Sequence, residues 1–183
     1  RFVASGVDVH QTFERFVGLG HVEESFAERI DDFAYNEWTL MGTHFALEEP
    51  PRYEAAEHTP EVDDALKYNV GLESIEAIRD AHDAVVDKRV PEPTSFGAGA
   101  LTMFDPTQAP DGSHTAYAWQ VAPYDLRGDP EAWEAEAQKC RDDVLERWGE
   151  YAPNMTEDNV VHSYTYSPRE IPRSVINMRQ GDI

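Results

Sequence analysis

The chain has 183 residues, of which 40% are hydrophobic and 28% are charged, a size that fits a single domain with its own core. No apolar run approaches the ~18 residues that a transmembrane segment needs. A single cysteine, Cys140, cannot form an internal disulfide, so a disulfide-bridged secreted scaffold is excluded.

Acidic residues dominate the charge: 36 Asp and Glu stand against 15 Lys and Arg, which gives a formal net charge of −21. Nucleic-acid binding depends on clustered Lys and Arg, so no nucleic-acid partner is expected. Many carboxylates with few lysines suit a protein that stays soluble in high salt, where screening removes self-repulsion. We therefore expect a halophilic protein, with a surface that is acidic by drift as the alternative.

The first third of the chain predicts a strand at 1–5, helices at 8–18 and 22–33, and a long strand at 37–47. Asp8 is placed to cap the first helix and Gly18 to end it. In the strand at 37–47, Trp38 and His44 share one face. Because both faces of this strand are largely apolar, we expect a central strand with other elements packed on each side.

The remaining chain predicts strands at 67–72, 99–104, 114–121 and 159–166, helices at 75–87 and 130–148, and a loop at 90–97. In the helix at 75–87, one side is formed by Ile75, Ile78, His82, Val85 and Val86. The helix at 130–148 is the clearest, because Asp129 caps it and apolar residues recur at helical spacing from Trp133 to Trp148. The sum is an α+β fold: a mixed, largely antiparallel sheet of about five strands with helices packed on it.

Sequence motifs with known chemistry are few. Gly97 and Gly99 open no helix, so they do not fit a dinucleotide-binding loop. The seven histidines lack metal-ligand spacing, so no metal site is predicted. Cys140 falls on the buried stripe of a helix and is interpreted as a structural thiol. No catalytic residue is predicted.

Four ring side chains are candidates for a binding surface. His44 lies in mid-strand among apolar neighbours, so it is either a hydrogen-bonded core histidine or a group that lines a cavity. Tyr117, Trp119 and Tyr124 pose the same choice between core packing and paving a pocket for a flat or long apolar ligand.

The segment 101–116, LTMFDPTQAPDGSHTA, followed by APYDL at 122–126, resembles the C-terminal half of the phytoene dehydrogenase-like flavoprotein oxidoreductases, which are related to the amine oxidases. Other pieces match that family in the same order. They are VASGVD at 3–8, FAL at 45–47 with Pro50 and Pro51, EYAPN at 150–154, YSPREI at 166–171 and MRQGDI at 178–183. The family's glycine-rich FAD motif is not in this sequence.

The resemblance implies that residues 1–183 form a single substrate-binding domain of a larger FAD-dependent enzyme, with 1–7 and 178–183 as the crossings to a flavin-binding domain of the same protein. FAD is implied for the complete enzyme but not for this chain alone, which is expected to be inactive. Gly181 and Asp182 are implied to lie nearest the cofactor. The residues expected to line the cavity, for an apolar carotenoid- or isoprenoid-like substrate or for an amine, are Trp38, His44, Trp119 and Tyr124.

Some alternatives stay open at this point. The alternative is a non-catalytic α+β module that binds a small molecule or a protein, because a fold does not select a function. A face that normally meets a flavin domain would expose apolar surface when alone, so a homodimer is a further option. The expected location is cytoplasmic, with a membrane-peripheral full-length enzyme as the alternative.

Overall fold

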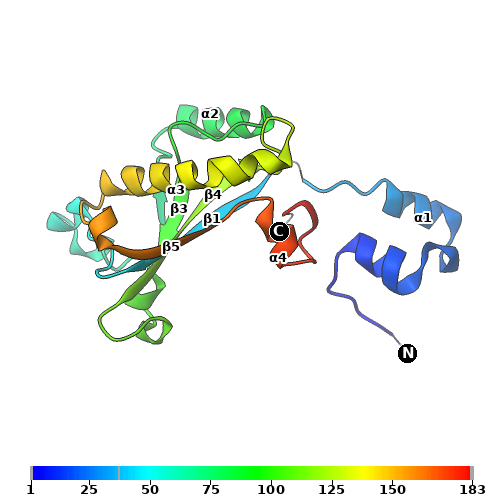
Figure 1. Ribbon diagram of the computed structural model, residues 1–183, viewed down its shortest axis with the longest axis horizontal. Helices are drawn as coiled ribbons and strands as arrows, with labels where there is room; N and C mark the ends of the chain where they lie inside the picture. The colour runs from blue at the N-terminus through cyan, green and yellow to red at the C-terminus, as the bar shows by residue number, and fades with distance from the viewer. Residues whose placement is uncertain (1, 37, 182–183) are drawn as a thin grey trace.

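The computed structural model describes residues 2–36 and 38–181 of the chain, and Figure 1 shows their arrangement. One sheet has the strand order β2-β3-β4-β1-β5, and all of its pairings are antiparallel. The strands are β1 (Trp38–Leu47), β2 (Tyr68–Val70), β3 (Phe96–Gly99), β4 (His114–Pro123) and β5 (Val160–Tyr166). The α-helices are α1 (Glu24–Asp31), α2 (Ile75–Val86), α3 (Trp133–Gly149) and α4 (Glu170–Ser174). The α+β fold predicted from the sequence is confirmed.

Shorter helices link these elements. A π-helix covers Gln11–Val17, and single 3₁₀ turns lie at Leu19–His21, Glu54–Glu57, Pro60–Val62, Leu101–Met103, Pro106–Gln108, Pro130–Ala132, Glu157–Asn159 and Arg179–Gly181. In the described part of the chain, no helix is long and apolar enough to cross a membrane.

The core lies between α3 and one face of the sheet. Phe45 and Leu47 of β1 point to this face and are buried, together with Val144 and Trp148 of α3. The indole N–H of Trp148 donates to the hydroxyl of Tyr53 at 3.0 Å, so the polar edge of the buried ring is satisfied. This is the core that the apolar spacing of 130–148 predicts.

Two predicted strands are wrong. The strand expected at 99–104 lies earlier, at β3, because Phe96 and Ala98 face the core there while residues 101–103 form a 3₁₀ turn. The strand expected at 1–5 does not form over the described residues 2–5, which are fully exposed and have no neighbouring strand to pair with. A strand needs a hydrogen-bonding neighbour, and a short apolar run does not provide one.

The N-terminal residues 8–33 form a helical arm that stands apart from the sheet (Figure 1). Its two helices pack through Phe13 and Phe26, whose ring centroids are 4.9 Å apart. The arm is tied to the C-terminal segment: the backbone N–H of Asp8 donates to Asn177 at 2.5 Å, and the side-chain amide of Gln11 donates to the carbonyl of Ile176 at 2.7 Å. Segments at the two ends of the chain therefore lie side by side.

Candidate functional site

The second face of the sheet, which points away from α3, remains exposed and is rich in rings. Trp38 and Trp119 are 47% and 45% exposed, and Tyr164 and Tyr166 are 47% and 39% exposed. We call this surface the open face; its ring residues are Trp38, His44, Tyr117, Trp119, His162, Tyr164 and Tyr166. The expectation that both sides of β1 are packed was therefore wrong, since only one of them is covered by α3.

Strand register arranges these rings in two rows across β4, β1 and β5. In the first row, Gly42 of β1 lies between Trp119 and Tyr166. In the second row, His44 lies between Tyr117 and Tyr164. Because residues two apart on a strand point to the same side, the two rows form one continuous aromatic surface.

Glycines allow two of these rings to lie close to the sheet. A Cβ atom added at Gly42 would lie 3.4 Å from the indole of Trp119. A Cβ atom added at Gly99 of β3 would lie 3.0 Å from the ring of Tyr117. Aromatic side chains commonly cover glycines on a neighbouring strand in this way. The rings therefore form a flat aromatic surface on the sheet, on which a planar or long apolar group can stack.

His44 is the central polar group of the open face, and charged groups lie near its edges: the side chain of Lys67 lies over Gly97, opposite Trp119, and Glu170 lies beside Tyr164. Partial burial lowers the pKa of His44, and the ring of Tyr166 meets the imidazole edge-on at 5.9 Å between centroids. The hydroxyl of Tyr164 donates to Glu170 at 3.0 Å, and this hydrogen bond raises the pKa of the tyrosine. A neutral imidazole among aromatic rings suits an apolar ligand better than an anionic one.

The structure brings three of the four predicted lining residues together, namely Trp38, His44 and Trp119. Tyr124 directly follows Pro123, the last residue of β4, and its contacts are with α3 and the segment at α4. Its carbonyl accepts the indole N–H of Trp133 at 3.2 Å, and its side chain is hydrogen-bonded to Arg169. Tyr124 therefore belongs to the region between β4, α3 and α4.

Gly181 is buried and has a positive φ of 70°. Its carbonyl accepts a hydrogen bond from the hydroxyl of Thr39, which points to the covered side of β1. A Cβ atom at this position would lie 2.8 Å from that hydroxyl, so only glycine fits without strain. Asp182, the other residue implied to lie near the cofactor, is outside the described residues.

Sequence reasoning did not propose Tyr164, Tyr166 or Gly42 for the site. The signal for the two tyrosines was present, because alternation along 159–166 puts them on one side of a strand. Nothing in a single sequence indicates that this strand pairs with β1, and so the tyrosines could not be joined to His44. Gly42 gave no signal, because its role depends on a tryptophan from β4.

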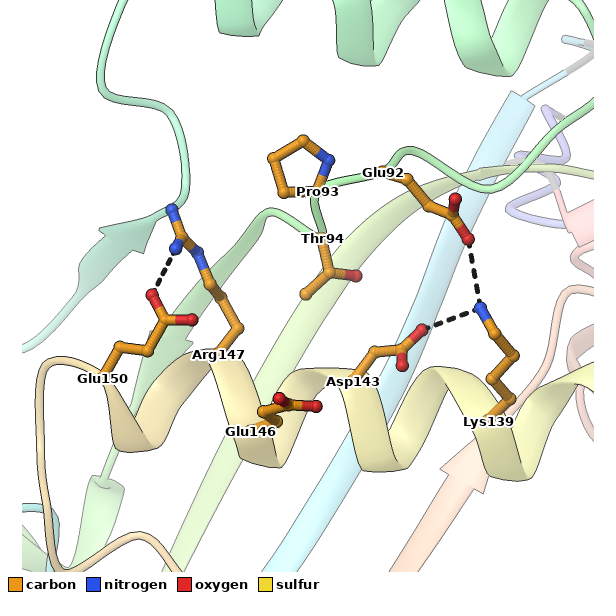
Figure 2. Close-up of a pocket in the computed structure, with 8 residues that line it drawn as sticks. All are labelled: Glu92, Pro93, Thr94, Lys139, Asp143, Glu146, Arg147 and Glu150. Carbon is orange, nitrogen blue, oxygen red and sulfur yellow. Dashed lines mark hydrogen bonds and ion pairs between the residues drawn. The ribbon is translucent and has the colours of Figure 1, made fainter.

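Two cavities lie away from the open face and are lined mainly by charged residues. One of about 240 Å³ lies between α3 and the loop before β3 (Figure 2). Lys139 bridges Glu92 and Asp143 there, at 3.1 Å to each. A second cavity of about 360 Å³ lies between α3 and α4 and is lined by Arg169, Arg173 and two glutamates among others. Among residues 2–36 and 38–181, no group of three or more His, Cys, Asp or Glu side chains is placed to hold a metal ion.

No family model matches the chain. Over 187 residues the chain is 24% identical to one of the subunits of limonene dehydrogenase from Castellaniella defragrans, a match that covers 98% of this chain and 33% of that protein. The chain thus spans about a third of the length of this relative. Among solved structures, it is similar to reduced UDP-galactopyranose mutase, with a TM-score of 0.43 and 13% identity over 81% of this chain and 24% of that chain. The chain is therefore a distant relative of a dehydrogenase subunit.

Proposed function

We propose that this chain is the substrate-binding domain of a flavin-dependent oxidoreductase similar to the phytoene dehydrogenases, and that its open face forms the roof of the substrate cavity. The exposed aromatic surface of β1, β4 and β5 carries the proposal. A soluble domain rarely leaves a contiguous apolar surface uncovered unless a ligand or partner covers it. The related subunit of limonene dehydrogenase supports an oxidoreductase with an apolar substrate, since its name gives a dehydrogenase acting on limonene, an isoprenoid hydrocarbon.

The residues present fit one wall of a flavin site and not a whole site. The sequence has no glycine-rich phosphate loop. In the cavity of Figure 2, four carboxylates outnumber the two cations Lys139 and Arg147, so the net charge of the lining disfavours a diphosphate. The open face suits flat rings and apolar chains. FAD is therefore assigned to a flavin-binding domain that is not in this sequence, and this domain is the proposed partner.

In this arrangement the flavin supplies the acceptor for a hydride or electron pair when it is bound, as in other flavoproteins. This chain positions the substrate and excludes water, and it supplies no redox group. Trp119 and Tyr166 hold the apolar body of the substrate by ring contact, and the sheet excludes water from the reacting bond. His44 offers a neutral imidazole at the centre of the surface. Gly181 and Asp182 belong to the segment that would lead toward the flavin domain.

The first test is made on the full-length flavoprotein, with limonene as an apolar probe. Trp119→Ala and Tyr166→Ala remove ring contacts of about 1–2 kcal/mol each, so each should raise KM roughly tenfold. Their flavin absorbance should stay at the wild-type level, because neither residue would hold the cofactor. Val86→Ala is the matched control, since Val86 is an exposed apolar residue on α2 and does not belong to the sheet. Unchanged KM in both ring variants would contradict the assigned role of the open face.

A second test uses the purified 183-residue chain alone. We expect no stoichiometric flavin absorbance after incubation with FAD and removal of free cofactor. A yellow protein with one flavin per chain would refute the assignment of the flavin to another domain. Tight binding of limonene by the isolated chain, with no flavin-binding partner needed, would favour a non-catalytic binding module.

A further inference from the structure

Two side-chain nitrogens of the open face lie over the same glycine. A Cβ atom added at Gly42 would lie 3.5 Å from Nε2 of His44 and 3.5 Å from Nε1 of Trp119. Because Gly42 has no side chain, the imidazole and the indole can both approach its backbone, and Gly42 is buried. The two nitrogens form a polar pair on the aromatic surface, where β1 meets β4.

Neither nitrogen of this pair has a hydrogen-bond partner among residues 2–36 and 38–181. His44 is exposed and Trp119 is 45% exposed, so water can solvate both groups in the isolated chain. Under the function proposed above, the flavin domain and the substrate cover this face and exclude water. A donor or acceptor that loses water and gains no partner weakens binding roughly tenfold or more. The substrate is therefore expected to carry a group that pairs with both nitrogens.

We propose, as an extension that rests on the proposed function, that His44 and Trp119 together bind one hydroxyl group of the substrate, which is an apolar alcohol. The indole N–H of Trp119 can only donate, whereas a neutral imidazole has one donor and one acceptor nitrogen. A hydroxyl accepts from Trp119 and pairs with Nε2 of His44 whichever nitrogen of the imidazole carries the proton. A carbonyl pairs with both groups only when Nε2 carries it.

Other chemical groups fit the pair less well. A hydrocarbon leaves both nitrogens unpaired. An ammonium group has no lone pair for the indole N–H of Trp119, so an amine is disfavoured among the substrates that the family resemblance implies. The alcohol is the group that satisfies the donor and the acceptor together.

The surroundings of the pair favour a neutral ligand. Partial burial lowers the pKa of His44, so its imidazole is uncharged at neutral pH. Tyr166 meets this imidazole edge-on, and the ring of Tyr117 lies against the indole of Trp119 with 5.0 Å between centroids. The side chain of Lys67 lies on the other side of Trp119, over β3. The neighbouring rings are placed to hold the apolar body of an alcohol while the pair binds its oxygen.

Equilibrium binding to the full-length flavoprotein tests the pair, with limonene and with carveol, which is limonene with one ring hydroxyl. The measured quantity is the dissociation constant for limonene divided by that for carveol. A comparison of this ratio between the wild type and a variant cancels the different water solubilities of the two probes. Trp119→Phe and His44→Phe keep a ring but remove one hydrogen bond each, so each should lower the ratio about fivefold. His82→Phe, at an exposed position of α2, is the matched control and should leave the ratio unchanged.

Carvone, the ketone of the same skeleton, separates an alcohol site from a carbonyl site. Its oxygen can accept from Trp119, so Trp119→Phe should weaken its binding relative to limonene. His44→Phe should leave that relative binding unchanged, because a ketone has no proton to donate to Nε2. If His44→Phe weakens carvone as much as carveol, the assignment of a hydroxyl is wrong. A carveol ratio that stays unchanged in either phenylalanine variant would also overturn the proposal.

The indole N–H signals in a nitrogen–proton correlation spectrum of the 183-residue chain report the contact directly. The signal of Trp119 is the one that Trp119→Phe removes. Carveol should move this signal farther than limonene does, in the direction of a stronger hydrogen bond. The signal of Trp133 should stay in place, because its N–H already donates to the carbonyl of Pro123 at 3.2 Å. Equal shifts with the two probes would contradict a bound hydroxyl.

These measurements separate the failure of the hydroxyl site from the failure of the proposed function. They record binding and not turnover, so a correct pair gives the expected ratios and shifts even if the flavin assignment is wrong. If the open face roofs the substrate cavity but the pair binds no hydroxyl, Trp119→Ala still raises KM for limonene. The carveol ratio then stays the same in Trp119→Phe and His44→Phe.

Discussion

Trp119→Ala and Trp133→Ala remove the same side chain from opposite sides of the sheet, and their costs should differ. Trp119 lies on the open face and is 45% exposed, whereas Trp133 is fully buried in the core beside Met41 and Ala122. If the open face serves binding and not folding, Trp119→Ala should weaken substrate binding more than it lowers the free energy of unfolding. Trp133→Ala should lower the free energy of unfolding more than it weakens substrate binding.

The structure sets the size of the difference. About half of the Trp119 ring is buried, roughly 100 Å² of contact, which corresponds to about 2 kcal/mol as an upper value. Trp133→Ala removes a whole buried ring and opens a cavity, which costs about 3–5 kcal/mol. It also removes the indole N–H that donates to the carbonyls of Pro123 and Tyr124, at 3.2 Å to each. We therefore expect Trp133→Ala to lose at least about 2 kcal/mol more than Trp119→Ala.

Urea unfolding followed by circular dichroism gives both free energies of unfolding on one scale. Acrylamide quenching of tryptophan fluorescence in the wild-type chain and in each variant checks which ring meets solvent. If the two variants lose equal stability, or if the fluorescence lost with Trp119 proves inaccessible to acrylamide, then the face described as open is covered in solution. The reasoning from the open face to a substrate cavity would then fail.

Three further results are expected. The melting temperature should rise from low to molar salt, because screening relieves the repulsion of a −21 chain; greater stability at low salt would count against a halophilic protein. The hydrogen bond from Arg141 lowers the pKa of Glu157, so this pair stabilises the fold above the ordinary pKa of 4.5 and loses its effect as pH falls through the lowered value. The free energies of unfolding of the wild type and of Glu157→Gln should therefore become equal at low pH. A difference between them that persists there would argue against a stabilising ion pair. Cys140 should resist a thiol reagent in the native chain and react after unfolding, whereas rapid labelling of the native protein would show that the helix α3 opens easily.

The elements of the fold followed from local patterns wherever those patterns match the tertiary packing. The apolar spacing from Trp133 to Trp148 predicts α3 and its buried face, and Ser74 caps α2 by accepting the N–H of Ala77 at 3.0 Å. The strand at 99–104 failed because small residues give little strand signal. Periodicity also describes a helix by itself, so it cannot tell that Ile75, Ile78 and Val86 of α2 face solvent.

The site was harder to predict than the fold, for a physical reason. Trp38 and His44 share one strand, so simple alternation places them on the same face. Whether Trp119, Tyr164 and Tyr166 join the same surface depends on which strands are neighbours, and that order depends on long-range packing. The flatness of the surface depends further on glycines that lie opposite the rings.

The tie between the helical arm and Asn177 has a practical consequence for anyone who shortens this protein. A chain that stops after Ser174 would keep the sheet, α3 and α4, yet it would lose the partner that receives the backbone N–H of Asp8. The first thirty or so residues would then tumble on their own, with sharp NMR lines and early cleavage by proteases. Deletion of the C-terminal segment would thus release the N-terminal arm from the rest of the protein.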